Sequence, residues 1–283
     1  MILVAAVLWG TIGVSTRAIF SLAETTALTV AFLRLVLALP VLGATSYAVL
    51  GRDGVRAAPR HLLLMAVIGV LLGVYQLFFF GAILRVGVAI ATLVTLCLAP
   101  VIVAILSPLL FGEQLTRRLV VSALLAISGT VLLVSPVDVA ALGGETGTGL
   151  LLALGSATGY ALVAIVSRQV ARVSHPLMPV TVGFAAGAAA LLPALLIDGP
   201  MLDFPLAGWL LLVYLAVVPS ALGYVLFTFG MRNTPATVAS LVTLIEPLTA
   251  AGLAWLLFDE RLGPLALVGA ALLLGAVWLL ARE

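Results

Sequence analysis

The chain has 283 residues, of which 64% are hydrophobic and only 8% are charged, with a formal net charge of +2. An ordinary soluble domain is about 45–50% apolar and about 25% charged, so this composition excludes a soluble globular protein and indicates that lipid surrounds most of the chain. The basic residues are few and dispersed, which excludes the clustered positive surface of a nucleic-acid-binding protein.

Hydropathy predicts an all-α integral membrane protein with ten transmembrane helices. The spans must be helical, because within lipid every backbone polar group has to be bonded inside its own segment. The N-terminal sequence MILVAAVLWG lacks the charged region and cleavage site of a signal peptide, so we expect it to lead directly into the first span. The predicted cores are approximately 2–20, 26–49, 62–84, 88–110, 119–135, 148–167, 177–197, 206–229, 236–257 and 264–280.

Arginine sets the predicted orientation, since the chain contains no lysine. Basic residues accumulate in the cytoplasmic loops of membrane proteins. With the N-terminus inside, the arginines on the outer side are only Arg17, Arg85 and Arg261. Those on the inner side are Arg52, Arg56, Arg60, Arg117, Arg118, Arg168, Arg172, Arg232 and Arg282. We therefore expect both termini to lie in the cytoplasm.

The two halves of the chain share motifs at a nearly constant offset, which indicates an internal repeat. The matched pairs are YQLFFFG (75–81) with YVLFTFG (224–230), LVTL (93–96) with LVTL (241–244), FGEQL (111–115) with FDERL (258–262), and Pro100 with Pro247. They predict two five-helix repeats, residues 1–136 and 147–283. Because five is odd, the second repeat enters the membrane from the opposite side, which makes this an inverted repeat.

An inverted repeat favours a secondary transporter. Two copies of one fold facing opposite ways can exchange conformations and expose a shared central site to each side in turn. A passive channel, or a protein that has lost transport, could retain the same duplication, and these alternatives stay open.

The repeated segments also carry a family resemblance over essentially the whole chain. The residues that carry it are Trp9-Gly10, FLRLVLALP (32–40), Pro100 with FGEQL, and Glu246-Pro247 with FDERL. Through them the chain resembles the ten-helix, EamA-type branch of the drug/metabolite transporter superfamily, and within it the bacterial YddG-type exporters of aromatic and other amino acids. The resemblance implies a multi-pass protein of the bacterial inner (plasma) membrane, with a cavity formed by helices 1, 3, 4, 6, 8 and 9. The repeats depart from symmetry at Ala99, which stands where the second half has Glu246.

Pro100 and Pro247 lie within predicted spans, where each would release a backbone carbonyl from its helix. Matched breaks in the two halves are the best sequence indicator of a transporter's central site, although a packing kink would leave the same pattern. Hydroxyl groups precede both breaks and could bind a zwitterionic substrate or only bond carbonyls of their own helix. These candidate substrate-binding residues are Thr92, Thr95, Ser240 and Thr243.

Charges within the predicted spans form a second group of candidates, because ionisable residues in lipid are costly and default to functional hypotheses. Glu246 could bind a substrate amino group or a proton, or it could form a structural hydrogen bond with a broken helix. For Arg34 we favour a structural role, either bonding helix ends or extending to the outer surface. Glu113 and Glu260, at corresponding helix ends, are expected to tie loops to neighbouring arginines or backbone groups.

Aromatic residues form a third group. Trp9 and Tyr160 occupy corresponding places in the first helix of each half and could stack on a substrate side chain. Tyr75 and Tyr224 lie nearer the outer and the inner side, which suggests one gate at each mouth. Ordinary packing within the bundle is the alternative for all four. Gln76, deep in its span, is expected to face polar surroundings.

Glycines at four-residue spacing, such as Gly69 with Gly73 and Gly155 with Gly159, predict faces along which helices pack closely. Such faces could form a dimer interface, but packing within one chain is their commoner use, so we expect a monomer.

No metal or cofactor site is expected, because Cys97 is the lone cysteine while His61 and His175 fall in loops beside arginines. No P-loop or ATPase subunit is evident, so a substrate gradient, exchange or an ion must drive transport.

The predicted function is export of aromatic and other neutral amino acids and related metabolites from the cytoplasm by alternating access. The predicted partners are the lipid bilayer and a small-molecule substrate. Export of drugs or other metabolites of the superfamily is the first alternative. A passive channel is less favoured, as is an integral-membrane enzyme, which would need a catalytic cluster near one membrane face.

Overall fold

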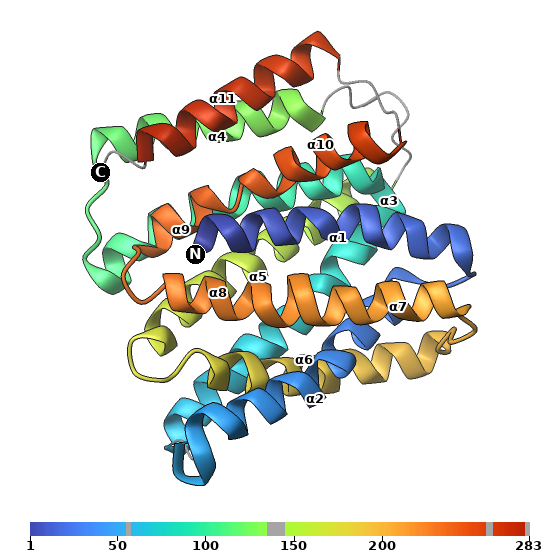
Figure 1. Cartoon of the computed structure of the whole chain (residues 1–283). Coiled ribbons are helices and arrows are strands. Elements are labelled where there is room, and N and C mark those ends of the chain that lie inside the picture. The colour runs from blue at the N-terminus through green and yellow to red at the C-terminus, as the bar shows by residue number, and fades with distance from the viewer. Residues whose placement is uncertain (55–57, 135–144, 259–262, 281–283) are drawn as a thin grey trace.

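A computed structural model gives the structure of the chain and describes residues 1–54, 58–134, 145–258 and 263–280. Within these ranges the regular structure is helical and no strand occurs, which confirms the predicted all-α membrane fold. The helices run alongside one another as a bundle (Figure 1).

The helices follow the predicted spans with a few differences. The elements are α1 (Ile2–Leu22), α2 (Ala27–Gly54), α3 (Pro59–Phe111), α4 (Arg117–Val134), α5 (Thr146–Ala171), α6 (Leu177–Asp198), α7 (Leu206–Leu215), the π-helical η2 (Ala216–Leu222), α8 (Gly223–Gly230), α9 (Ala236–Val242), α10 (Ile245–Phe258) and α11 (Pro264–Leu280). The third and fourth predicted spans are joined in α3, the eighth is divided among α7, η2 and α8, and the ninth comprises α9 and α10.

Eight helical segments of the described chain are long and apolar enough to cross a membrane. Two of them are the halves of α3, Pro59–Val86 and Ile90–Phe111, and α11 is a shorter apolar helix. The expected number of ten spans is not confirmed, because α11 has 17 residues and α4, with 18, is not among the eight. Large apolar side chains such as Leu84 and Ile197 are 84% and 85% exposed, which is the surface that lipid would cover.

The bundle has two ends that differ in their contacts. α1 begins and α11 ends on the left in Figure 1, and we call this side the terminal end. The opposite side, where α1 ends at Leu22 and α2 begins at Ala27, is the distal end. α4 and α11 pack together at one edge of the bundle, while α3 packs on both α5 and α6.

Glycine permits the closest of these contacts, as the spacing predicted. A Cβ atom added at Gly69 would lie 2.0 Å from the carbonyl oxygen of Gly183, so the backbones of α3 and α6 nearly touch. A Cβ at Gly159 would lie 2.7 Å from the Cβ of Tyr75, where α5 crosses α3. These contacts hold α3 against α6 and α5 and fix the position of Tyr75.

The two prolines act differently, so the prediction of matched breaks is right for the second half and wrong for the first. α3 remains helical through Pro100, whereas the helix before Pro247 is interrupted at Thr243 and Leu244. There the N–H of Glu246 takes the carbonyl of Thr243 that a proline cannot bond, at 2.9 Å. This three-residue bond tightens the turn between α9 and α10 and places Glu246 at the start of α10.

Candidate functional site

A cavity of about 820 Å³ lies in the bundle between α1, α2, α3, α5, α8 and α10. It extends along α1 from Trp9 to Phe20 and along α2 from Arg34 to Ala27, so it runs from mid-bundle toward the distal end. Eight of the ten predicted substrate-binding residues line it, namely Trp9, Tyr75, Gln76, Thr92, Thr95, Tyr160, Tyr224 and Glu246.

The four predicted aromatic residues gather in one cluster at the inner part of this cavity. The ring centroids of Trp9 and Tyr224 are 4.9 Å apart, and those of Tyr75 and Tyr160 are 5.6 Å apart. The hydroxyl-bearing rings of Tyr75 and Tyr224 also interact with each other, which links the two pairs. This differs from the expectation of one tyrosine at each mouth, because the depth of a residue along its helix does not determine where its side chain points.

Two opposite charges face the cavity. Arg34 of α2 and Glu246 of α10 both line it and interact electrostatically. The Nε atom of Arg34 is buried and has no hydrogen-bond partner. Arg17, on α1, lines the cavity nearer the distal end.

Arg34, for which the sequence favours a structural role, also lines the cavity. The spacing of α2 could have indicated this, because residues three or four positions apart share one face of a helix. Ala27, Ala31 and Arg34 follow that spacing, and all of them line the cavity. The resemblance had not included this helix among those that form the cavity.

The predicted hydroxyls separate into two sets. Thr92 and Thr95 line the cavity, and the buried hydroxyl of Thr95 has no hydrogen-bond partner. Ser240 and Thr243 instead bond their own helix, since Ser240 Oγ donates to the carbonyl of Thr237 at 2.9 Å and Thr243 Oγ1 donates to that of Ser240 at 2.7 Å. The structural alternative therefore describes the bonding of the second set.

Gln76 is buried in α3 and lines the cavity that Arg34 and Glu246 also face. Its Nε2 atom donates to the carbonyl of Leu72, one turn earlier in the same helix, at 2.9 Å. This bond fixes the amide within its own helix.

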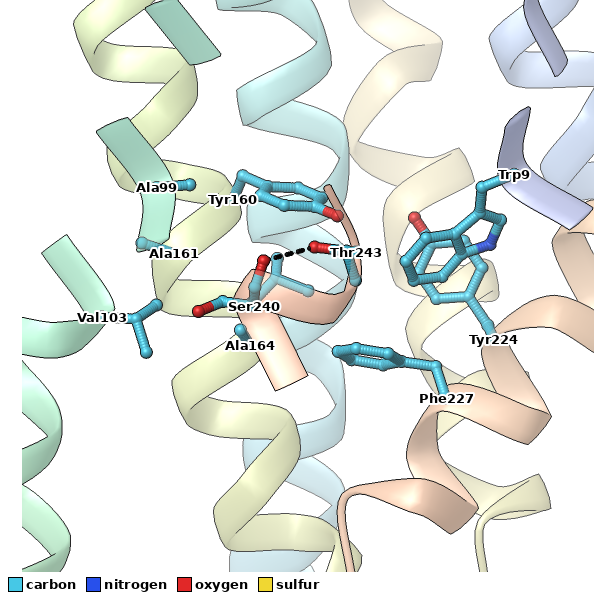
Figure 2. A pocket seen from close by; sticks show the side chains of 11 residues that line it. Trp9, Ala99, Val103, Tyr160, Ala161, Ala164, Tyr224, Phe227, Ser240 and Thr243 are labelled. Carbon is cyan, nitrogen blue, oxygen red and sulfur yellow. Dashed lines mark hydrogen bonds between the residues drawn. The ribbon is translucent and has the colours of Figure 1, made fainter. Parts of the chain in front are cut away.

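Toward the terminal end the side chains pack closely and leave little space between the helices. A second pocket of only about 10 Å³ lies beside the cavity, where Trp9, Tyr224 and Phe227 face Ser240 and Thr243 across a small gap (Figure 2). The ring centroids of Trp9 and Phe227 are 5.2 Å apart. The indole N–H of Trp9, from α1, donates to the buried carbonyl of Pro219 in η2 at 3.0 Å, so this aromatic layer is fixed by a hydrogen bond as well as by packing.

Glu113 ties two helix ends together at the terminal end, as expected of it. α3 ends at Gly112, whose φ of 65° is the left-handed conformation that glycine adopts without strain, and the chain then turns to Glu113. The carboxylate of Glu113 accepts the N–H of Ala236 at 2.8 Å, the N–H of Thr237 at 3.3 Å and the hydroxyl of Thr237 at 2.9 Å. It thereby bonds the free amides at the start of α9. Its predicted counterpart Glu260 lies outside the described residues.

Nearby, two arginines bond backbone carbonyl groups at the C-terminal ends of helices. Arg168 of α5 donates to the carbonyl of Met231 after α8. Arg232, in return, donates to the carbonyls of Ala171 at 3.2 Å and Ser174 at 2.9 Å after α5. Cations are favoured at helix C-termini, where the last carbonyls have no partner in their own helix.

His175 lies in the loop between α5 and α6, beside these arginines. Partial burial and the neighbouring Arg232 both lower the pKa of its imidazole below the usual value. The ring of His175 stands edge-on to Phe229 at 5.5 Å, and its Nδ1 accepts the N–H of Leu177 at 3.4 Å. A neutral imidazole therefore suits this position.

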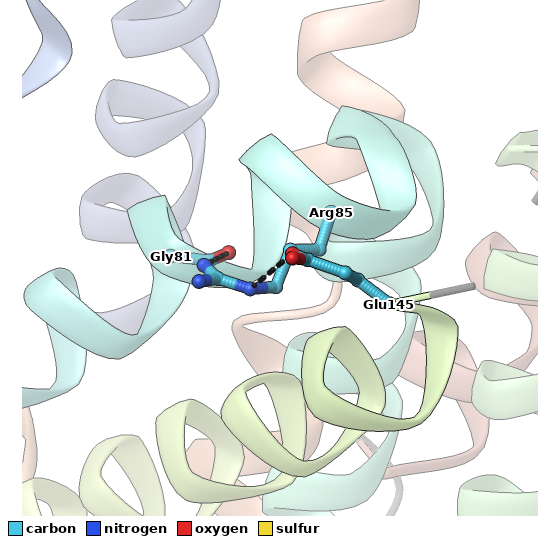
Figure 3. A network of polar contacts seen from close by, with 3 residues as sticks. All are labelled: Gly81, Arg85 and Glu145. Atoms are coloured by element: carbon cyan, nitrogen blue, oxygen red, sulfur yellow. Dashed lines mark hydrogen bonds and ion pairs between the residues drawn. The ribbon is translucent and has the colours of Figure 1, made fainter. Parts of the chain in front are cut away.

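At the distal end an ion pair joins α3 to the start of α5. Arg85 lies 3.0 Å from the carboxylate of Glu145 through Nε, and its Nη1 donates to the carbonyl of Gly81 at 3.0 Å (Figure 3). The side chains of Arg85 and Glu145 are 33% and 74% exposed. No group of three or more His, Cys, Asp or Glu side chains that could hold a metal occurs in the described part of the chain.

Comparison with known proteins places these features in a family. The sequence matches the EamA-like transporter family over residues 1–135 and over residues 147–282. A solved crystal structure of a protein 24% identical to this chain superposes with a TM-score of 0.84, covering 99% of this chain and 96% of that one. At that level of identity the likeness shows the fold alone.

Two curated relatives share most of the sequence. An uncharacterized transporter of Archaeoglobus fulgidus is 32% identical over 72% of this chain and 71% of its own length. The pseudopaline exporter CntI of Pseudomonas aeruginosa is 25% identical over 83% of this chain and 81% of its own length. The family and these relatives are transporters rather than enzymes, and a multi-pass chain with such a cavity is a membrane transporter of small metabolites. The chain belongs to the EamA-like transporter family.

Proposed function

We propose that this chain exports amino acids, aromatic and other neutral ones, and related small metabolites from the cytoplasm across the bacterial inner membrane. The observation that carries the proposal is the composition of the cavity, which combines aromatic rings with two arginines and a glutamate inside otherwise apolar helices. An amino acid presents matching groups, because it joins an apolar or aromatic side chain to a pair of opposite charges. Aromatic rings offer such side chains a favourable stacking surface.

We propose alternating access as the mechanism, with both termini in the cytoplasm. Under that orientation the distal end faces the periplasm, and the described conformation is the outward-facing one from which an exported substrate leaves. The terminal end would open in the inward-facing conformation. Inverted repeats comprising residues 1–136 and 147–283 would supply that second conformation, because each copy can adopt the arrangement of the other.

The proposed transporter works as a monomer without a metal, a cofactor or an ATPase subunit. Its driving force would then be the substrate gradient, exchange or a coupled ion. Glu246 is the carboxylate through which a proton could be coupled, since it faces the cavity at the start of α10. In the amino-acid proposal, Trp9, Tyr75, Tyr160 and Tyr224 surround the side chain of the substrate.

Counterflow into liposomes tests the proposal. Purified protein is reconstituted into liposomes preloaded with one unlabelled amino acid, and labelled phenylalanine is offered outside. Export by alternating access predicts transient accumulation of label that requires the preload. Label that never exceeds the level in protein-free liposomes would remove the amino-acid proposal, while uptake independent of the preload would indicate a channel.

A second candidate is an exporter of larger metabolites. The cavity volume of about 820 Å³ lies in the upper part of the range of about 300–1,000 Å³ that is typical of pockets for drug-sized ligands. The relative CntI is a pseudopaline exporter. Competition in the same liposomes separates the two candidates. If the second candidate is right, larger metabolites inhibit the exchange of label more strongly than unlabelled phenylalanine does.

A further inference from the structure

Two opposite charges face the cavity without being bonded to each other. Arg34 and Glu246 interact electrostatically, and within the described part of the chain neither forms an ion pair. The buried Nε of Arg34 has no hydrogen-bond partner. Arg34 also lines the cavity, and a charged donor left without an acceptor away from water is unfavourable, so a ligand in the cavity that brings an anionic acceptor to the guanidinium would be stabilised.

We propose that this part of the cavity is a zwitterion site, in which the Arg34 guanidinium binds the carboxylate of the substrate and the Glu246 carboxylate binds its ammonium group. The inference rests on the proposed function and sharpens it by assigning each charged group of the substrate to a residue. A guanidinium matches a carboxylate through two parallel N–H donors. An ionised carboxylate only accepts hydrogen bonds, and an ammonium group only donates them.

The arrangement of the neighbouring residues places the rest of the substrate. Arg34 acts electrostatically on Tyr75 and Tyr224, and Glu246 acts on Tyr75 and Tyr160. Both charges therefore lie beside the aromatic cluster, where the side chain of a bound amino acid would pack. Thr95, whose buried hydroxyl has no hydrogen-bond partner, lines the same cavity.

A comparison with the distal ion pair supports a role in binding. Arg85 and Glu145 approach to 3.0 Å and neutralise each other directly, although water can reach both. Arg34 and Glu246, within the membrane-spanning helices, have more to gain from direct contact, yet they remain apart. Arg17 lies nearer the distal end and is exposed, so it would attract a carboxylate toward the cavity without fixing it there.

The test uses three probes that differ only in their charged groups: phenylalanine, phenylalanine amide, which lacks the carboxylate, and 3-phenylpropionate, which lacks the ammonium group. Their equilibrium binding to purified protein and their exchange in liposomes are measured for the wild type, Arg34→Gln, Arg34→Lys and Glu246→Gln. Arg60→Gln is the matched control, because Arg60 is an exposed arginine near the start of α3 at the terminal end. Thermal unfolding in detergent verifies that each variant is folded.

Each substitution is expected to weaken only the probes that carry the charged group bound by the substituted residue. Arg34→Gln weakens the binding of phenylalanine and of 3-phenylpropionate by about 10- to 100-fold but leaves the amide unchanged. Glu246→Gln weakens phenylalanine and the amide but spares 3-phenylpropionate. Arg34→Lys restores part of the affinity, because it keeps the charge but loses the paired donors, and Arg60→Gln matches the wild type.

Two outcomes overturn the inference in distinguishable ways. If the wild type exchanges phenylalanine while Arg34→Gln leaves its affinity unchanged or weakens all three probes alike, the zwitterion site is wrong and the proposed function stands. If the wild type neither binds nor exchanges phenylalanine, the amino-acid function fails and the site fails with it. Should Arg34→Gln not fold, equal binding of phenylalanine and its amide to the wild type would by itself overturn the role of Arg34.

Discussion

The two ends of the bundle are held by different kinds of contact. At the terminal end, Glu113, Arg168 and Arg232 each bond the free backbone end of a helix from another part of the chain. Toward the distal end the cavity lies among α1, α2, α3 and α10, and the ion pair of Arg85 with Glu145 joins only α3 to α5.

This difference indicates how the conformation is held. Helix-end amides and carbonyls must find partners when water is excluded, so charged side chains that supply them draw the terminal end together. The same bonds can be exchanged for bonds to water, which makes them suitable for a contact that opens and closes. An apolar core does not offer this reversibility, because it gains nothing when water enters. The terminal end is therefore closed by contacts that a transport cycle could break.

The largest effect is expected at the backbone contact between α3 and α6 in the terminal half. A Cβ introduced by Gly69→Ala would meet the carbonyl oxygen of Gly183 at 2.0 Å and its carbonyl carbon at 2.7 Å. Backbone atoms cannot rotate away, so the helices must separate, at a cost of about 1–3 kcal/mol or more in unfolding free energy. Thermal unfolding in detergent should show a clear decrease in Tm.

Gly43→Ala in α2 is the matched control, since a Cβ there meets no atom within 4 Å. Alanine is the better helix former by about 1 kcal/mol, so this variant should be as stable as the wild type or slightly more stable. Equal Tm values for the two variants would show that α3 and α6 are not in close contact.

The next effect concerns Glu113→Ala, which removes the acceptor of three hydrogen bonds at the start of α9. Loss of a helix N-cap costs about 0.5–2 kcal/mol, which would favour opening of the terminal end by about 2- to 30-fold. The readout is the rate of maleimide labelling in a Cys97→Ser background. Ser240→Cys, in the small pocket, should be labelled faster, and Gly13→Cys, in the cavity, more slowly.

Glu24→Ala provides the comparison for Glu113→Ala, because Glu24 is exposed at the distal end between α1 and α2. It should leave both labelling rates at their starting values. Acceleration of both reporters together by Glu113→Ala would mean general unfolding and would contradict a contact that favours one conformation.

Much of the fold could be predicted from sequence, because lipid imposes one rule on every residue. Composition alone indicates helices in a membrane, and hydropathy places them. Local departures from regular helical hydrogen bonding cannot be predicted from composition or hydropathy. Pro100 and Pro247 look alike in sequence, but the helix continues through Pro100, whereas near Pro247 the N–H of Glu246 takes over the released carbonyl and the helix is divided. The π-helical η2 (Ala216–Leu222) likewise has no hydropathy signal.

The sequence identifies most residues of the candidate site, but it does not show where their side chains point. Residues that precede the prolines or occur in the repeated motifs do gather around one cavity. Ser240 and Thr243 instead line the adjoining small pocket, and each hydroxyl is bonded to a carbonyl of its own helix. That Arg34 of α2 lines the same cavity as Glu246 of α10 depends on how these helices pack, which no local pattern encodes.

A smaller effect is expected from pH at the terminal end. Burial and Arg232 lower the pKa of His175, so the folded protein binds a proton there less readily than the unfolded chain does. Stability is therefore complete above the unfolded pKa of about 6.5 and decreases as the pH falls below it. The decrease in Tm between pH 7.5 and pH 5.5 should be smaller in His175→Asn than in the wild type. His61→Asn is the control substitution, because it changes the other histidine.

The smallest effect is expected at the distal ion pair, where Glu145→Gln removes the charge that faces Arg85. Both side chains reach water, and such pairs contribute about 0–1 kcal/mol, so Tm and both labelling rates should barely change. The same substitution at the terminal end, Glu113→Gln, should shift the labelling rates more, because that carboxylate bonds two backbone amides and a hydroxyl. If Glu145→Gln has the larger effect, then the distal end, rather than the terminal end, carries the contact that sets the conformation. The two Glu→Gln variants therefore measure, with one chemical change, which end of the bundle is held closed by charge.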